Sequence, residues 1–374
     1  MSALRPLLLA LCLVGIGFVV GYGFQARGAR PVVSVAPAPT PQAPLVKGLH
    51  ASPDGKLLAF TGVYARSERA GVWILNATTG TATQRESPAG WQDFVTQWRS
   101  DGSALLLERE RIPRPVASAS AGLYQAPVER NTAQNGLSQT GELEPLAEDV
   151  APRGERIITG LLTPNGELVI KTRREPKALY VVRDGIALPI DRAGVTYGQN
   201  RPVREGGKLV FYVVRDMPGD ASKVALFRVE SGRARQISAP WEDVEWSYVA
   251  PSGKQIIVAR QSEEGEDWNW TLYGIGPTGL KTLKTASIPA DVISVYWSPD
   301  EKRVLGAAGD KLWLIDVPTL QVHQLGSKTD WNADDATWIG NEQIAVAESG
   351  EIWRVNVKSA QATRLWRFPE PFWK

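Results

Sequence analysis

SPDGKLLAF, at residues 52–60, is a tight turn followed by an apolar strand, and it decides the fold because the pattern recurs. Pro, Asp, Asn and Gly supply the backbone angles of a hairpin turn. The alternating aliphatic residues that follow predict a β-strand. The unit returns as RSDGSALLL (99–107), TPNGELVI (163–170), REGGKLVF (204–211), APSGKQIIV (250–258), SPDEKRVLG (298–306) and IGNEQIAVA (339–347). Seven copies predict a repeat architecture.

A second unit follows each copy of the first, in which an aliphatic residue and then an aromatic one open another strand. The seven pairs are Val72-Trp73, Leu123-Tyr124, Leu179-Tyr180, Leu226-Phe227, Leu272-Tyr273, Leu312-Trp313 and Ile352-Trp353. Several of these strands run into a further turn and strand, as in VESGRARQI (229–237) and VKSAQATRL (357–365). With two hairpins in each repeat of roughly 40–56 residues, the sequence predicts an all-β fold, a seven-bladed β-propeller of four-stranded antiparallel blades.

The aromatic residues of these pairs have a packing role in such a fold. A large flat side chain at the same place in every blade can fill the layer between blades, burying on the order of 150–250 Å². The same reasoning applies to Trp98, Trp297 and Trp338, which precede the turns in the predicted innermost strands. We therefore expect most of the 14 tryptophans to lie in the core rather than in a ligand site.

The turn motif resembles that of a known family. In its clearest forms, Trp297-Ser298-Pro299-Asp300 and Ser52-Pro53-Asp54-Gly55, it is similar to TolB-type, WD40-like β-propeller repeats, which also build the propellers of prolyl-oligopeptidase-like peptidases. The resemblance spans residues 46–368, although Gly206-Gly207 and Gly340-Asn341 replace Pro-Asp-Gly in two blades. It implies an architecture rather than an activity. The peptidases add a hydrolase domain and TolB adds an α/β domain, and we expect neither here.

The N-terminus predicts a membrane anchor. After a short tail at 1–6, Leu7 to Phe24 is a run of uncharged residues that is nearly long enough to cross a bilayer core, which takes about 20 apolar residues. A cleaved signal peptide is the main alternative, although it calls for a shorter apolar core and a small-residue cleavage site. Lipidation of Cys12 is a weaker alternative, because bulky Leu11 precedes it.

The segment after the anchor, residues 25–45, is a Pro/Ala-rich linker that favours extended polyproline II backbone. Such a linker would act as a semi-rigid spacer that lifts a domain off the membrane. Arg5 lies on one side of the anchor and Arg27 and Arg30 on the other, so the basic-residue rule barely selects an orientation. Because short N-terminal tails usually stay in the cytoplasm, we expect the propeller on the extracytoplasmic side, in a periplasm or at the cell surface.

Composition excludes several classes of function. The 374 residues carry a net charge of +2, and the basic residues before position 31 account for this excess, so no nucleic-acid partner is expected. One cysteine and two histidines exclude disulfides and His- or Cys-rich metal sites. There is no G-x-S-x-G, Walker A or H-E-x-x-H motif. We expect no cofactor, no metal site and no enzymatic activity.

Binding is expected on the face that carries the long, varied loops between strands two and three and between blades, since function concentrates in such loops. A basic cluster there comprises Arg66, Arg69, Arg109, Arg111, Arg173 and Arg174. An acidic and aromatic cluster comprises Glu266, Asp267, Trp268, Asp334 and Asp335, and the inter-blade loops add Trp91, Tyr197, Trp241 and Trp331. Opposite charges across one face suit a polar protein or polysaccharide partner.

Two further segments stand out. Residues 113–146, within blade 2, are rich in Pro, Ala and Ser and then in Gln, Asn and Gly, which predicts an insertion. The last residues, 369–374, form an aromatic tail that would either pack over the last blade or dock elsewhere.

The leading hypothesis is a membrane-anchored, extracytoplasmic β-propeller that serves as a non-enzymatic protein- or polysaccharide-binding or scaffolding module. Two alternatives stay open. One is a catalytic propeller, a hydrolase or lyase, that uses carboxylates in the central funnel such as Asp334 and Glu266. The other is a structural subunit of a larger membrane complex, in which the anchor itself makes the contact.

Overall fold

The computed structural model describes a defined part of the chain. The described residues are 44–64, 70–111, 122–131, 136–138, 143–147, 157–163, 166–172, 178–183, 186–191, 202–217, 219–261, 267–289, 294–308, 311–325 and 333–369. All of them belong to one compact unit, Pro41–Lys374. The predicted anchor at 7–24 and almost all of the linker lie outside them. Within the described ranges, no helix is long and apolar enough to span a bilayer.

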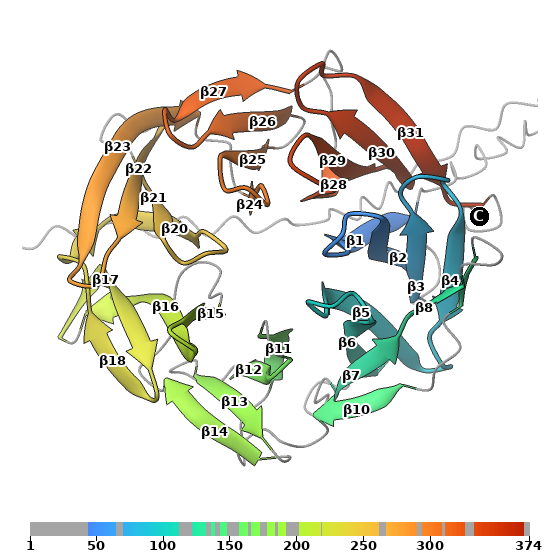
Figure 1. Ribbon diagram of the computed structural model, residues 1–374, viewed down its shortest axis with the longest axis horizontal. Helices are drawn as coiled ribbons and strands as arrows, with labels where there is room; N and C mark the ends of the chain where they lie inside the picture. Colours follow the sequence, from blue (N-terminus) through green and yellow to red (C-terminus); the bar gives the residue numbers. More distant parts are fainter. Residues whose placement is uncertain are drawn as a thin grey trace, which may run out of the picture. The chain divides into compact units, whose positions relative to one another are not determined.

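Seven antiparallel sheets are arranged in a ring (Figure 1). Blade 1 comprises β1 (Leu45–Ala51), β2 (Leu57–Val63), β3 (Ala70–Asn76) and β4 (Ala82–Glu86). Blade 2 comprises β5 (Trp91–Trp98), β6 (Ala104–Arg111), β7 (Gly122–Pro127) and β10 (Glu144–Ala147). Blade 3 comprises β11 (Ile157–Leu162), β12 (Leu168–Thr172), β13 (Leu179–Arg183) and β14 (Ile186–Asp191).

Four more blades complete the ring. Blade 4 comprises β15 (Pro202–Glu205), β16 (Lys208–Met217), β17 (Asp220–Glu230) and β18 (Arg233–Gln236), with β19 (Trp241–Glu242) also paired to β17. Blade 5 comprises β20 (Val244–Val249), β21 (Gln255–Gln261), β22 (Asp267–Ile275) and β23 (Leu280–Pro289). Blade 6 comprises β24 (Ser294–Trp297), β25 (Arg303–Ala308), β26 (Lys311–Asp316) and β27 (Gln321–Gln324), and blade 7 comprises β28 (Ala333–Trp338), β29 (Gln343–Glu348), β30 (Glu351–Asn356) and β31 (Ala362–Arg367).

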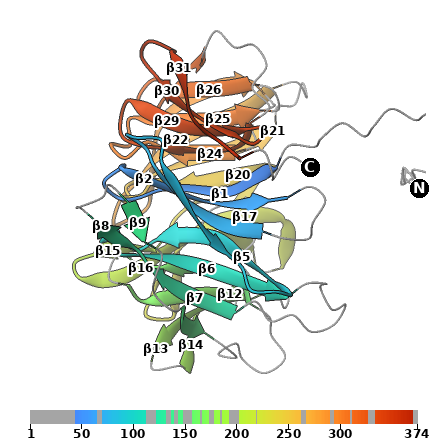
Figure 2. The ribbon, with the colours of Figure 1, turned by 90° about the vertical axis from the view of Figure 1, so that its right-hand side faces the viewer.

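This topology confirms the predicted seven-bladed propeller of four-stranded blades. Viewed from the side, neighbouring sheets stack face to face along the ring (Figure 2). Within the bounds predicted for the insertion, 113–146, the structure places the regular blade strand β7 and most of β10. Between them a small hairpin forms from β8 (Glu129–Asn131) and β9 (Gly136–Ser138).

The recurrent Ser-Pro-Asp turn folds through its own side chains. In blade 1 the Ser52 hydroxyl donates to the Asp54 carboxylate at 2.7 Å and accepts the Leu57 N–H at 2.9 Å. In blade 6 the Ser298 hydroxyl makes the same two bonds, to Asp300 at 2.7 Å and from Arg303 N at 3.0 Å. These hydrogen bonds stabilise the two turns that match the family motif best, because the side chains accept backbone N–H groups within the turn.

The tryptophans at the ends of the inner strands join neighbouring blades. The Trp98 indole N–H donates to the His50 carbonyl of blade 1 at 3.0 Å, and the Trp338 indole N–H donates to the Tyr296 carbonyl of blade 6 at 2.8 Å. Both tryptophans are buried, as is Trp297. The packing role predicted for these three residues is confirmed. The two hydrogen bonds also link blade 2 to blade 1 and blade 7 to blade 6.

The ring closes without exchanging a strand between its two ends, because blade 1 and blade 7 are each built from consecutive strands. Asp335 of β28 makes the connection. One of its carboxylate oxygens accepts the Leu49 N–H of blade 1 at 2.8 Å, and the other accepts the Tyr296 hydroxyl of blade 6 at 3.0 Å. A register shift in β1 between Lys47 and His50 leaves the Leu49 N–H free to meet this carboxylate.

An aromatic cluster covers the outer part of the same seam. Phe60 and Trp73 of blade 1 pack against Trp366 and Phe368 at the end of blade 7, with ring centroids 4.6–6.5 Å apart. Phe368 is only 2% exposed. Pairs of rings in tilted and edge-to-face arrangements contribute about 0.5–1.5 kcal/mol each beyond their buried area. Of the predicted aromatic tail, 369–374, all but Pro369 lies outside the described residues.

Glycines allow the backbones of blades 1 and 7 to approach closely. Gly55 has a φ of +70°, and a Cβ there would lie 2.0 Å from the Ile339 carbonyl oxygen. Gly80, with a φ of +72°, would bring a Cβ within 2.7 Å of the Leu365 carbonyl oxygen. Any side chain at these positions would push the first and last blades apart.

We expect Gly55→Ala to destabilise the protein far more than Gly206→Ala. Gly206 lies in the equivalent turn of blade 4 with a φ of +55°, and a Cβ added to it would meet no atom within 4 Å, so it reports the cost of the backbone conformation alone. That cost is about 1–2 kcal/mol for a non-glycine residue, and the clash with Ile339 should at least double it. Equilibrium denaturation of both variants measures the difference. Equal losses of unfolding free energy would contradict the role of this seam.

Asp335→Asn should also destabilise the ring, because an asparagine has one acceptor oxygen and must turn an N–H donor toward another donor. The loss expected from an unmatched buried partner is about 1–3 kcal/mol. Asp216→Asn, at an exposed position of β16, is the control and should leave unfolding unchanged. If the two variants unfold at the same denaturant concentration, the Asp335 bridge does not close the ring.

Candidate functional site

The predicted basic cluster contains an internal ion pair. Asp93 of β5 lies directly opposite Arg109 of β6. The Arg109 Nε and Nη2 atoms donate to the two Asp93 carboxylate oxygens at 2.6 and 2.8 Å. Asp93 is 1% exposed, and the guanidinium also lies over the Tyr124 ring at 4.9 Å. Arg109 is therefore held inside blade 2 and serves the fold at this face rather than presenting a free charge.

Arg85 lies close to this pair. Burial lowers the pKa of the Arg85 guanidinium, the Asp93 charge acts to raise it, and the Arg109 charge lowers it further. Arg85 keeps its charge at neutral pH, since arginine titrates far above it. The seam between blades 1 and 2 thus holds two guanidinium groups around one buried carboxylate.

Trp91 and Arg111 are the predicted binding residues that the structure brings together at the surface. They are cross-strand partners at the ends of β5 and β6. Trp91 is 37% exposed and Arg111 is exposed. Asp93 and Arg109 are the next pair on the same face of the hairpin, so the buried ion pair holds the strands that carry Trp91 and Arg111.

Trp241 is not on a loop surface, as the sequence analysis expected, but in the core. It lies in β19, opposite Val224 of β17, and is 6% exposed. Its ring packs 5.7 Å from that of Tyr273 in the layer between blades 4 and 5. The expectation was wrong because the chain pairs with β17 again after β18 ends. The short strand β19 therefore carries Trp241 into the sheet of blade 4.

The described members of the acidic and aromatic cluster do not form one patch. Asp267 is exposed at the start of β22 and accepts the Ser287 hydroxyl at 2.9 Å. Trp268 is half-buried against the layer between blades 5 and 6, and Asp335 belongs to the ring closure. Asp334 lies on β28, but its side chain is outside the described part. The other predicted residues outside the described ranges are Arg66, Arg69, Arg173, Arg174, Tyr197, Glu266 and Trp331.

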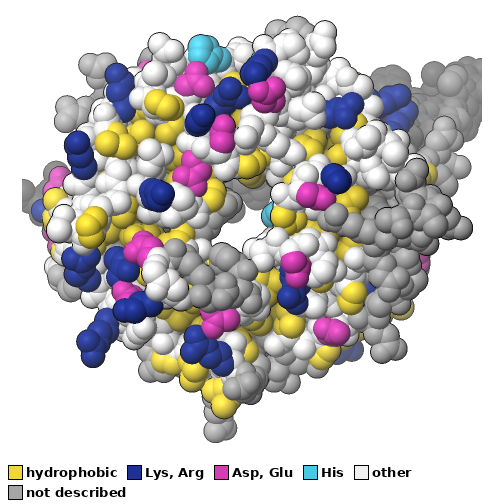
Figure 3. All heavy atoms as spheres, in the orientation of Figure 1, with side chains coloured by type: hydrophobic (Ala, Val, Ile, Leu, Met, Phe, Trp, Pro, Cys, Tyr) yellow, Lys and Arg dark blue, Asp and Glu magenta, His cyan; other side chains and the backbone are white. Residues whose placement is uncertain are grey.

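Charges of both signs are interspersed around the ring in Figure 3, which also shows an opening at its centre. Among the described residues, no group of three His, Cys, Asp or Glu side chains is placed to hold a metal ion.

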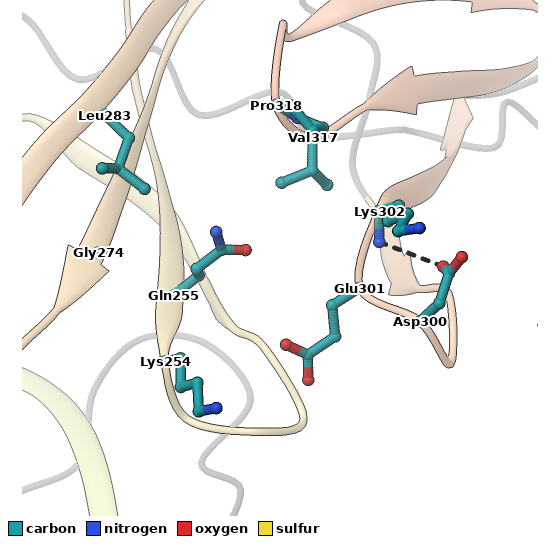
Figure 4. Close-up of a pocket in the computed structure, with 9 residues that line it drawn as sticks. All are labelled: Lys254, Gln255, Gly274, Leu283, Asp300, Glu301, Lys302, Val317 and Pro318. Carbon is teal, nitrogen blue, oxygen red and sulfur yellow. Dashed lines mark hydrogen bonds between the residues drawn. The ribbon is translucent and has the colours of Figure 1, made fainter.

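A notch between blades 5 and 6 lies on the side of the tight turns, which the sequence analysis did not single out. It has a volume of about 420 Å³ (Figure 4). Its lining residues are Lys254, Gln255, Gly274, Leu283, Asp300, Glu301, Lys302, Val317 and Pro318. Blade 5 supplies the first four, and the turns of blade 6 supply the other five. The volume falls within the range of about 300–1,000 Å³ that is typical of ligand pockets.

The apolar walls of the notch depend on a bulge in β23. Leu272 pairs with Lys284 and Tyr273 pairs with Thr282, so Leu283 has no partner on β22. It is 46% exposed, although it is a large aliphatic residue. Gly274 leaves room beside it, and Leu283 and Val317 point toward the centre of the notch from opposite sides (Figure 4).

Glu301 joins the two blades at the edge of the notch. It takes the place of the turn glycine in the Ser-Pro-Asp-Gly motif and adopts a φ of +57°. Its carboxylate accepts the Ser252 N–H and, at 2.7 Å, the Ser252 hydroxyl of the blade 5 turn. A non-glycine residue in this conformation costs about 1–2 kcal/mol, and the two bonds to Ser252 offset that cost. The Glu in place of Gly at position 301 is a sequence signal that could have identified this site.

Two lysines and two carboxylates line the notch, so its lining carries no net charge. Asp300 accepts the Ser298 hydroxyl and the Lys302 N–H inside its own turn. Burial acts to raise the pKa of Asp300, but these hydrogen bonds hold it below its ordinary value. Glu301 is bound to Ser252. Lys254 is exposed and makes no ion pair or side-chain hydrogen bond with the described residues.

The buried layer next to the notch contains several indole N–H groups that have no hydrogen-bond acceptor among the described residues. Trp270 and Trp297 belong to the same buried layer as Val317, together with the partly buried Trp246 and Trp313. Within the described ranges, the indole N–H groups of these four tryptophans find no acceptor. The N–H groups of Trp98 and Trp338 do find one in their seams. Buried donors are normally paired, so these four indole N–H groups distinguish this layer.

No family model and no curated protein matches this chain. Among solved structures, an oligogalacturonate lyase from Vibrio parahaemolyticus is similar, with a TM-score of 0.59 and 13% identity over 83% of this chain and 89% of that one. A prolyl endopeptidase gives 0.54 and 12% over 86% and 50%. Hydrazine synthase from Kuenenia stuttgartiensis gives 0.51 and 13% over 90% and 98%. These likenesses support the propeller part of the expected resemblance, and the TolB-type assignment stays a prediction. They show a fold shared by proteins of unrelated chemistry, which does not by itself select a function.

Proposed function

We propose that this protein is a membrane-tethered, extracytoplasmic β-propeller that binds or scaffolds another protein or a surface polysaccharide, without catalysing a reaction. The observation that carries the proposal is the exposed Trp91–Arg111 pair at the end of the blade 2 hairpin. Trp and Arg are the residue types that most often dominate the energy of a binding interface.

The rigidity of this pair supports a binding role. The bidentate Asp93–Arg109 ion pair, with Asp93 almost fully buried, lies two residues further into the hairpin. A second contact ties the same strand to blade 1, since the Val95 N–H donates to the Thr61 hydroxyl at 2.8 Å. An anchor residue that is held in place before binding loses less conformational entropy when the partner arrives.

Asp335, the described carboxylate next to Asp334, has a structural role. Asp335 accepts hydrogen bonds from Leu49, Tyr296 and Ala336, so its two oxygens are occupied by the ring closure. The catalytic alternative would depend on Asp334 and Glu266, whose side chains lie outside the described part. Because Asp335 is committed to the ring closure, this carboxylate lends the catalytic alternative no support.

Trp91→Ala and Arg111→Glu should each reduce capture of the partner by about tenfold or more, which corresponds to the loss of a dominant interface residue. The measurement is quantitative affinity capture from a membrane extract of the source organism with the full-length protein. Ile186→Ala is the control, since Ile186 is 62% exposed on blade 3, far along the chain from this hairpin. Unchanged capture by both blade 2 variants would refute the proposed face.

The tether is tested separately. We expect the full-length protein to stay in the membrane pellet after an alkaline carbonate wash, and a variant that lacks residues 7–24 to become soluble, because the apolar run supplies the bilayer contact. Recovery of the full-length protein in the soluble fraction would contradict the tether.

A further inference from the structure

We propose that the notch between blades 5 and 6 is a docking site for an acidic polypeptide segment that inserts one aliphatic side chain between Leu283 and Val317. This surface lies on the side of the tight turns and is independent of the Trp91–Arg111 pair. It would give the propeller a second point of attachment for a protein partner.

The shape of the notch fits an aliphatic side chain. Leu283 and Val317 form opposite apolar walls, with Pro318 beside Val317 and the Gln255 amide between the walls (Figure 4). The Gln255 amide offers a donor and an acceptor to the backbone of a guest chain. Because Glu301 is bonded to Ser252, the two blades that form the walls are held at a fixed separation.

Leu283 is exposed without an evident structural reason. Among the described residues, five large hydrophobics are exposed, and of the other four, Leu45, Trp91, Ile186 and Leu188, only Ile186 is more exposed than Leu283. The bulge in β23 brings Leu283 to the surface, whereas regular pairing would place another residue there. Bulges often redirect a side chain at a functional site. Burial of an exposed leucine by a partner would stabilise the complex by about 1.5–3 kcal/mol.

The charges around the notch favour an acidic partner. Lys254 and Lys302 line it, and Lys281 is the cross-strand partner of Gly274, which also lines it. Lys254 and Lys281 are exposed and have no ion-pair partner among the described residues. The two nearby carboxylates, Asp300 and Glu301, are already hydrogen-bonded within the turns. With Lys281 included, three lysines stand against these two carboxylates, so a partner that brings carboxylates would meet a small net positive charge.

The edge of blade 5 favours an extended polypeptide over other acidic ligands. β23 is the last strand of its sheet, so one side of its backbone has no neighbour in that sheet. An extended segment can lie along such an edge, while its alternate side chains enter adjacent pockets. Lysines on an edge strand discourage pairing between two copies of the same strand, yet they attract an acidic one. The lining residues include no aromatic ring, whereas an aromatic face is the surface that a sugar would stack on.

The test is fluorescence anisotropy with a labelled peptide of sequence Glu-Thr-Glu-Leu-Glu-Thr-Glu and the full-length protein. We expect saturable binding that weakens as salt is added. Replacing the central Leu of the peptide by Ala, or its Glu residues by Lys, should reduce affinity by about tenfold or more. No saturable binding of the parent peptide, or equal binding of all three peptides, would overturn the proposal.

Variants of the protein place the site. Leu283→Ser and Lys254→Glu should each weaken peptide binding by about tenfold. Both residues are exposed, so the unfolding midpoint should not change. Leu188→Ser, at a 41% exposed leucine on blade 3, is the matched control and should bind as the wild type does. Equal binding by Leu283→Ser and the control would refute the notch as the site.

Two further arms separate the alternatives. Trp91→Ala should bind the peptide normally, so that failure of the blade 2 proposal and failure of this one are distinguishable. Alginate, an acidic polysaccharide without aliphatic side chains, should compete only weakly. If alginate displaced the peptide as well as unlabelled peptide does, the site would belong to an acidic polysaccharide and the proposal would be wrong.

Discussion

The contact between the first and last blades is the constraint on which the rest of the ring depends. No strand is shared across this seam, so side chains and close backbone contacts close the ring. They include one carboxylate, two close backbone approaches, an aromatic cluster and a buried aliphatic layer. Asp335 is the central element because it reaches blade 1 through Leu49 and blade 6 through Tyr296. Leu49, in the bulge of β1, and Asp335 lie near opposite ends of the propeller sequence. The buried N–H of Leu49 is hydrogen-bonded because the Asp335 carboxylate accepts it.

Departures from the repeat mark the places where the blades differ in role. The repeat in each blade consists of the turn and the aromatic of the third strand, and three blades add a tryptophan at the end of the inner strand. Glu301 breaks the turn rule and joins two blades, while the bulge at Leu283 breaks the pairing rule and exposes a leucine. Both departures occur at one seam, where the indole N–H groups of Trp270 and Trp297 also find no acceptor among the described residues. Local rules are most often broken at functional sites, which is why this seam is a second candidate for recognition besides the Trp91–Arg111 pair.

The fold could be predicted from the sequence because its signals are local and repeated. The Ser52 and Ser298 turns and the burial of Trp98 and Trp338 all follow from short patterns. The candidate site could be predicted only in part, because roles there depend on pairings between distant strands. Arginine is usually exposed, but the cross-strand partner of Arg109 is the buried Asp93. No pattern around Trp241 indicates that β19 adds to the edge of β17.

Amide hydrogen exchange at Leu49 tests the central claim most directly. The Leu49 N–H lies in a bulge, and among the described residues its one hydrogen-bond acceptor is the Asp335 side chain of the last blade. If the ring is closed as described, this amide exchanges as slowly as those of the paired core strand β2. Exchange at the rate of an unstructured peptide would show that the seam is open in solution, and the account of the closed ring would fail.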